Sequence, residues 1–79
     1  MKVNVLFFGA TADLVGARKI EAPVSETTLA ADVIEQLHAQ YPNLKDHALL
    51  FAVNEEYVSG DTRLKNGDEL AIFTPVSGG

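Results

Sequence analysis

The sequence predicts an α+β domain in which one main helix lies across one face of a single mixed sheet. Segments with the alternating apolar pattern of strands lie on both sides of one stretch with the four-residue apolar spacing of a helix. The chain has 79 residues, of which 47% are hydrophobic and 22% charged. That composition is typical of a folded domain, and that length allows a modest core but no second lobe. The predicted order of elements is β-β-α-β-β-β.

The first two predicted strands differ in polarity. Residues 3–8 are rich in Val and Phe and are apolar on both faces, which indicates a strand at the centre of the sheet. Residues 11–16 are expected to form a loop that contains a short helical turn. Residues 18–24 alternate apolar and charged side chains, which is typical of a strand with one face in water, and Pro23 near its end removes one backbone donor.

One stretch of the chain has helical periodicity. Thr27 and Thr28 are the candidate N-cap residues of a helix that is expected to run to about Tyr41 and to stop at Pro42. Polar residues fill the side opposite its apolar stripe. The stripe consists of Leu29, Val33, Leu37 and Tyr41. This pattern predicts an amphipathic helix that packs on one face of the sheet.

Three more strands are predicted after the helix, at residues 49–53, 57–58 and 69–74. The segment Asn66-Gly67-Asp68 predicts a tight turn before the last strand, because Asn and Gly tolerate a positive φ. The first and last strands are both apolar on two faces. A β-grasp (ubiquitin-like) arrangement explains this, because it places these two strands side by side.

A second apolar surface follows from the strand alternation. If the residues at odd positions of the first strand face the helix, then Leu6, Phe8, Ala71 and Phe73 face away from it. A sheet with one helix has no second layer to cover that side, so this side is expected to bind a partner. The alternative is that the loop at residues 10–17 folds over it.

The composition excludes several classes of function. Six basic residues against eleven acidic ones give a net charge of −5, which argues against nucleic acid binding and suits a partner with a basic surface. The absence of cysteine excludes a disulfide scaffold, a zinc knuckle and a thiol nucleophile, and it fits the cytosol. No apolar run approaches the roughly 20 residues that a membrane helix needs.

Motifs for catalysis and metal binding are missing. Residues 9–16 lack the Gly-Lys-Ser/Thr of a phosphate-binding loop, and His38 and His47 lack the spacing of metal ligands. The carboxylate pairs Glu55-Glu56 and Asp68-Glu69 are interpreted as solvated turn residues rather than as a general acid and base. We therefore expect that the chain is not an enzyme by itself and that it binds no metal and no cofactor.

The C-terminal residues carry the strongest functional signal. Pro75 ends the last strand, so residues 75–79 are expected to form a flexible tail after a domain of residues 1–74. An extended tail of this length reaches up to roughly 20 Å beyond Thr74. Because Gly78 and Gly79 lack a Cβ, they can enter a narrow channel and bring the terminal carboxylate to a reactive centre. The alternative is a frayed terminus without a function.

Several stretches spread over the chain form a family pattern. They are Val5-Leu6-Phe7-Phe8, Asp13-Leu14-Val15-Gly16, Ala52-Val53-Asn54, Leu64, Gly67-Asp68-Glu69 and Pro75-Val76-Ser77-Gly78-Gly79. With these residues the sequence resembles, over nearly its whole length, the small subunit of molybdopterin synthase, that is, the MoaD-type ubiquitin-like sulfur carriers. Members of that family commonly have a proline where Thr74 stands and an alanine where Ser77 stands.

The resemblance implies a sulfur carrier in molybdenum cofactor biosynthesis. The terminal carboxylate, on Gly79, would be adenylated by an ATP-dependent activating enzyme and converted to a thiocarboxylate with sulfur from a donor protein. ATP would be used by the activating enzyme and not bound by this chain. The thiocarboxylate would then pass its sulfur to cyclic pyranopterin monophosphate in the active site of the large subunit.

The resemblance also implies which residues meet the large subunit. The tail residues that would enter its active site are Pro75, Val76, Ser77 and Gly78. The residues that fall where the family has apolar contacts are Phe8, Tyr57 and Phe73. The expected assembly is a heterotetramer of two small and two large subunits.

Three other functions share parts of this pattern. A sulfur carrier of the thiamine pathway also ends in two glycines, although the Phe7-Phe8 strand and the stretch from Gly67 to Pro75 favour the molybdenum pathway. A ubiquitin-like modifier would join the same activated terminus to lysines. A non-catalytic interaction module would use only the apolar surface.

Overall fold

The computed structural model describes residues 1–75, so the predicted tail residues Val76, Ser77, Gly78 and Gly79 lie outside the described residues. The elements follow one another along the chain as β1 (Lys2–Phe7), α1 (Ala10–Val15), β2 (Lys19–Pro23), α2 (Ala30–Gln40), the 3₁₀ helix η1 (Pro42–Asp46), β3 (Leu50–Val53), β4 (Glu56–Tyr57) and β5 (Glu69–Phe73). Every strand that the sequence predicts is present, with ends shifted by at most one residue.

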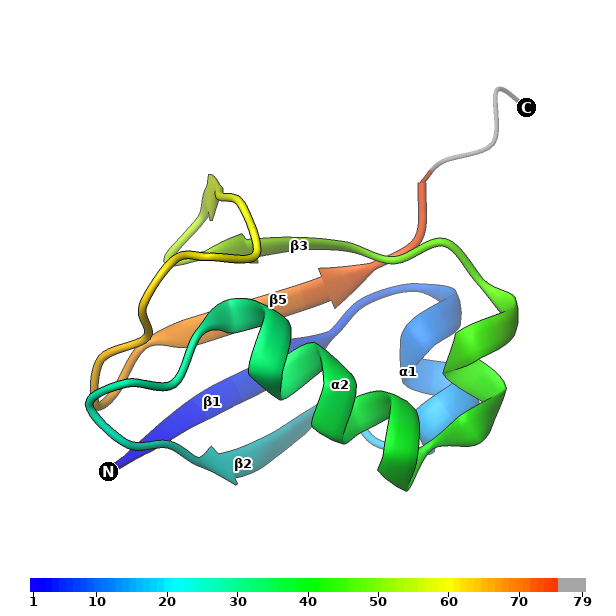
Figure 1. Ribbon diagram of the computed structural model, residues 1–79. Helices are drawn as coiled ribbons and strands as arrows, with labels where there is room; N and C mark the ends of the chain where they lie inside the picture. The colour runs from blue at the N-terminus through cyan, green and yellow to red at the C-terminus, as the bar shows by residue number, and fades with distance from the viewer. Residues whose placement is uncertain (76–79) are drawn as a thin grey trace.

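The strands form one five-stranded sheet in the order β2-β1-β5-β3-β4, with α2 across one of its faces (Figure 1). The first and last strands, β1 and β5, are parallel neighbours at the centre, while the other pairs are antiparallel. The sheet is therefore mixed, and the predicted β-grasp fold is confirmed. This arrangement explains why both central strands are apolar on two faces.

The core lies between the sheet and α2. Alternate side chains of β1 and β5 point into it, and Val3, Val5, Leu70 and Ile72 are each 0% exposed. The predicted apolar stripe of α2 packs on them, since Val33 and Leu37 are buried in the same cluster. Leu44 of η1 and Leu64 also belong to this cluster. The side chains of the strands thus divide into a buried set and a set that faces away from α2.

The prediction that Thr27 or Thr28 caps the helix is wrong. The N-cap is Leu29, whose backbone N–H donates to the Asp32 carboxylate at 2.8 Å. The Thr28 hydroxyl instead accepts from the backbone N–H of Ser25 at 2.8 Å, inside the turn before the helix. Leu29 is held in an extended conformation by a bridge to Arg63, so the helix cannot start earlier. The predicted stop is confirmed, because Pro42 begins η1.

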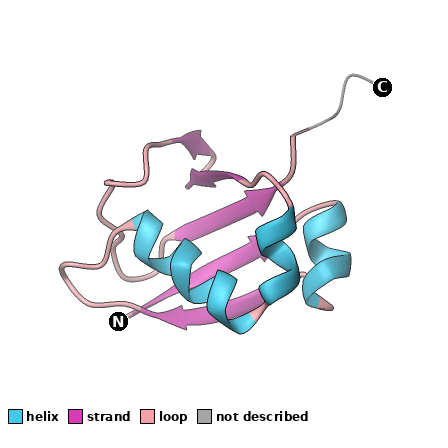
Figure 2. Cartoon of the chain, turned by 45° about the vertical axis from the view of Figure 1, so that its right-hand side comes forward, coloured by secondary structure: helices cyan, strands magenta, loops and turns pink. Residues whose placement is uncertain are grey.

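The segment predicted as a loop with a helical turn is the helix α1. Gly16 ends it in the left-handed region at φ 79°, and its N–H donates to the carbonyl of Ala12 at 2.8 Å. Leu14 and Val15 pack against the core, and the Asn43 amide donates to the carbonyl of Leu14 at 2.9 Å. Helix α1 therefore lies beside η1 at one end of the sheet (Figure 2) and leaves the face opposite α2 open.

Thr11 is a buried polar residue that connects α1 to both central strands. Its hydroxyl lies 2.7 Å from the carbonyl oxygen of Phe8 and 3.0 Å from that of Ile72, and the side chain is 0% exposed. The carbonyl of Ile72 also accepts from the N–H of Phe8 at 3.0 Å. These bonds fix the end of β1 against the end of β5.

Replacing Thr11 by valine is expected to lower the melting temperature by about 4–8 °C. A lost buried hydrogen bond costs roughly 1 kcal/mol, and each kcal/mol shifts the melting temperature of a domain this size by about 4–8 °C. Thermal unfolding followed by circular dichroism measures the shift. Thr11→Ser keeps the hydroxyl and is the matched control, so equal melting temperatures for the valine and serine variants would contradict this role of the hydroxyl.

Candidate functional site

The candidate site begins with the outer face of the sheet, which is the face turned away from α2. The register aligns its side chains across four strands, because Leu6 lies opposite Ala71, Ala71 opposite Ala52, and Ala52 opposite Tyr57. The same alternation puts Phe73 on this face. The predicted outward direction of Leu6, Ala71 and Phe73 is thus confirmed.

Large apolar side chains are exposed on this face. Phe8 is 52% exposed and Tyr57 is 76% exposed, and Leu50, which lies opposite Phe73, is 39% exposed. The rings of Tyr57 and Phe73 meet edge to face with their centroids 5.8 Å apart. We define the docking face as the set Leu6, Phe8, Leu50, Tyr57, Ala71 and Phe73. It contains all three residues that the resemblance assigns to the partner interface, and that assignment stays a prediction.

The docking face leads to the start of the tail. An open groove of about 380 Å³ is lined by Phe8, Gly9, Ala71, Phe73, Thr74 and Pro75. Thr74 and Pro75 follow β5 directly, so the chain leaves the sheet beside the exposed ring of Phe8. The remaining residues of the predicted site, 76–79, lie outside the described residues.

A second groove lies on the other side of Phe8. It has a volume of about 580 Å³, and its lining includes Leu6, Phe8, Asp13, Arg18 and Lys19. Most of its lining residues are apolar, and its charged residues are two cations and one carboxylate. No sequence pattern places this pair of cations beside Phe8, because the groove forms only when β2 lies beside β1.

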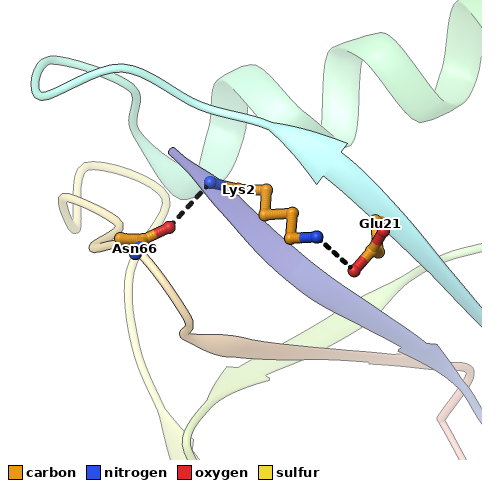
Figure 3. A network of polar contacts seen from close by, with 3 residues as sticks. All are labelled: Lys2, Glu21 and Asn66. Atoms are coloured by element: carbon orange, nitrogen blue, oxygen red, sulfur yellow. Dashed lines mark hydrogen bonds and ion pairs between the residues drawn. The ribbon is translucent and has the colours of Figure 1, made fainter.

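The outer face is polar at the opposite end of β1. The ammonium group of Lys2 lies 2.9 Å from the carboxylate of Glu21, and the backbone N–H of Lys2 donates to the side chain of Asn66 at 3.0 Å (Figure 3). The hydrogen bond from Lys2 and the positive charge of Lys2 lower the pKa of Glu21. Exposed pairs of this kind add little stability. The contacts of Lys2 with Glu21 and Asn66 therefore mark where the apolar part of the outer face ends.

Asp68 lies at the turn before β5, as the sequence predicts, and its carboxylate also makes hydrogen bonds there. Its carboxylate accepts from the backbone N–H of Lys65 at 2.7 Å and from the side-chain amide of Asn54 at 3.0 Å. Asn54 also bonds the backbone of Glu69 through its own N–H and its side-chain oxygen. Two segments that carry the family resemblance therefore hold the β3–β5 pair together. They have a structural role at this end of the sheet.

The histidines and the other carboxylates form no common site. His38 lies on α2 and His47 follows η1, and within residues 1–75 no three acidic or histidine side chains gather as metal ligands do. No helix in this part of the chain has the length and apolar character that crossing a membrane requires.

A protein-family model matches nearly the whole chain. The family model described as the ThiS family matches residues 5–79. Among curated proteins, the molybdopterin synthase sulfur carrier subunit of Escherichia coli (strain K12) is 40% identical over 98% of this chain and 99% of its own length. The protein with that name from Homo sapiens is 35% identical over 99% of this chain and 94% of its own length.

Solved structures show the same fold. A putative molybdopterin converting factor subunit 1 from Pyrococcus furiosus superposes with a TM-score of 0.89 at 30% identity, over 96% of this chain and 99% of that one. SAMP1 from Haloferax volcanii gives 0.87 at 25% identity, over the whole of both chains. A complex of subunits 1 and 2 of molybdopterin-converting factor from Helicobacter pylori gives 0.74 at 24% identity, also over the whole of both chains. At that identity it supports the fold alone.

Proposed function

The chain belongs to the ThiS family, and from this premise we propose that it is the sulfur carrier subunit of a molybdopterin synthase and that the carboxylate of Gly79 is its working group. The observation that carries the proposal is the likeness to molybdopterin synthase sulfur carrier subunits, at up to 40% identity over nearly the full length of both chains. The docking face supports it, because an exposed apolar surface leads directly to the first residue of the tail.

The proposed chemistry takes place at the C-terminus. A carboxylate is a poor electrophile, so one of its oxygens first attacks ATP on the activating enzyme, which releases pyrophosphate and forms an acyl adenylate. Sulfur that the donor protein supplies at the oxidation level of sulfide then attacks the acyl carbon, the bond to AMP breaks, and the terminus becomes a thiocarboxylate. The donors that stabilise the oxyanion in these steps belong to the activating enzyme. This chain supplies the reacting group and its position, and it is not an enzyme by itself.

The folded part and the tail have separate tasks in this proposal. Residues 1–74 form the domain that binds the large subunit through the docking face, and residues 75–79 form the tail that enters its active site. The residues that enter this active site together with Gly79 are Pro75, Val76, Ser77 and Gly78. Because Gly78 and Gly79 have no Cβ, they fit a narrow channel. The sulfur then passes to cyclic pyranopterin monophosphate, and water cleaves the acyl C–S bond, so that the terminus becomes a carboxylate again. We place these steps in the cytosol, and the chain contains no cysteine that would need an oxidising compartment.

Mass spectrometry of the chain isolated from its native cell tests the proposal. A fraction of the molecules is expected to carry sulfur in place of one oxygen at Gly79. A terminus that is always an unmodified carboxylate, under conditions in which molybdenum cofactor is being made, would contradict the proposal and favour an interaction module. A thiocarboxylate on a chain that does not bind the large subunit would favour the thiamine pathway.

One observation favours a second candidate function. The similarity to SAMP1 from Haloferax volcanii spans the whole of both chains. Another solved structure from that organism is named small archaeal modifier protein 1. A modifier uses the same activated terminus to form an isopeptide bond with a lysine. The same mass spectrometry distinguishes the two, because lysine-linked adducts of Gly79 with other proteins indicate a modifier.

A further inference from the structure

The groove on the far side of Phe8 differs in charge from the rest of the molecule. The chain has six basic residues and a net charge of −5, yet Arg18 and Lys19 are adjacent and both line this groove. Both side chains are exposed. We call Arg18 and Lys19 the cationic rim.

The cationic rim has no ion-pair partner within the folded part. Between residues 1 and 75 the one ion pair shorter than 4.0 Å joins Lys2 to Glu21. Asp13 also lines the groove but forms no ion pair of that length with the cationic rim. Together with Lys2, the charge of Lys19 helps to lower the pKa of Glu21, which lies on the same strand as Lys19. Neither Arg18 nor Lys19 is held in an ion pair within residues 1–75, so both can interact with a carboxylate outside the domain.

The cationic rim is continuous with the docking face. Lys19 lies opposite Leu6 in the register of β1 and β2, and Leu6 lies opposite Ala71 of β5. The ring of Phe8 belongs both to this groove and to the groove that contains Pro75. A protein that covers both sides of the Phe8 ring therefore lies next to Arg18 and Lys19.

We infer that Arg18 and Lys19 bind carboxylate side chains on the surface of the large subunit that contacts Phe8. This inference rests on the proposed function. It reverses an expectation from composition, because an overall charge of −5 suggests a basic partner surface. The local arrangement favours an acidic segment next to an apolar patch, at the end of the docking face where the tail begins.

The physical effect of such a rim is expected mainly in the association rate. Exposed ion pairs add little affinity, because water and salt screen them and long side chains lose freedom when they pair. Complementary charges at the edge of an interface do steer the encounter of two proteins, and this effect falls as the salt concentration rises. For an acidic carrier, the cationic rim would also select which end of the docking face meets the acidic segment.

The test compares two charge reversals that change the net charge equally. Lys19→Glu alters the cationic rim, whereas Lys45→Glu alters η1, which packs against α2 and α1. Association of each full-length variant with the large subunit is measured by stopped-flow fluorescence at low and high salt. We expect Lys19→Glu to slow association about tenfold at low salt, and Lys45→Glu to change it less than about twofold. High salt should remove most of the difference.

Each other outcome has a defined meaning. Equal association rates for the two variants would overturn the inference while leaving the proposed function intact. Failure of the parent chain to bind the large subunit at all would overturn the proposed function and the inference with it. If the difference between the variants vanishes in chains that end at Pro75, the cationic rim binds the carrier's own tail, and if it appears only with the activating enzyme, that enzyme carries the acidic segment. Either result overturns the inference.

Discussion

Replacing Phe8 by aspartate is expected to weaken binding to the large subunit of molybdopterin synthase by about a hundredfold or more. Phe8 is 52% exposed and is shared by both grooves, so it belongs to each part of the surface that we propose to bind the large subunit. Loss of a large apolar anchor typically costs 2 kcal/mol or more, and each 1.4 kcal/mol is a factor of ten in affinity. An aspartate buried there without a partner adds a desolvation cost.

The fold should tolerate this change. The bonds that hold Phe8 in place use its backbone, since its N–H donates to Ile72 and its carbonyl accepts from the Thr11 hydroxyl. The matched control is Glu35→Lys on the exposed side of α2, which reverses a charge on the opposite face of the molecule. Calorimetric titration of the large subunit with both variants and the parent gives the affinities. Equal affinities for all three would remove the docking face as the interface.

The sequence predicted the features that depend on hydrophobic patterning. The central position of β1 and β5 followed from two strands that are apolar on both faces, and the outward direction of Leu6, Ala71 and Phe73 followed from strict alternation. Leu50 also lies on the outer face, opposite Phe73, and was not predicted there. The alternation of residues 49–53 carries the signal that would have placed it.

The features that the sequence did not predict depend on contacts between distant segments. Thr28 has the chemistry of an N-cap, but the bridge between Leu29 and Arg63 sets where α2 begins. The Thr11 hydroxyl bonds the carbonyl of Ile72, which is 61 residues away in the chain. Such pairings have no local signal, because the residues meet only after the sheet has formed.

The cationic rim was missed for the same reason. Arg18 and Lys19 are near Phe8 only because β2 pairs with β1 in antiparallel register, and along the chain they are separated from Phe8 by α1. The net charge of the whole chain is −5, and it does not indicate the local positive charge of this pair. A local charge on a docking face can therefore be opposite to the charge of the whole domain.

Deleting Gly79 is expected to reduce sulfur transfer by a hundredfold or more. The variant still ends in a glycine carboxylate, on Gly78, but the carboxylate is about 3.5 Å short along an extended chain. A displacement of around 1 Å at a reacting group can cost about a hundredfold in rate. Adding an alanine after Gly79 should also fail, because the carboxylate is displaced and a Cβ enters the channel.

Stability and docking serve as controls for the Gly79 deletion. Within residues 1–75 the buried core residues all lie between Val3 and Ile72, so the deletion is expected to leave the melting temperature unchanged, and truncation after Pro75 is expected to do the same. The deletion variant should also bind the large subunit with nearly the parent's affinity, because Phe8 and Phe73 are intact.

The most direct measurement of the central claim is pterin sulfuration in a reconstituted system that contains the large subunit, the activating enzyme, ATP and a sulfur source. The parent chain is expected to support formation of the dithiolene of molybdopterin. The Gly79 deletion, which should be as stable and as tightly bound, is expected to support almost none. Turnover by the deletion variant at a rate close to the parent's would show that the terminal carboxylate is not the working group.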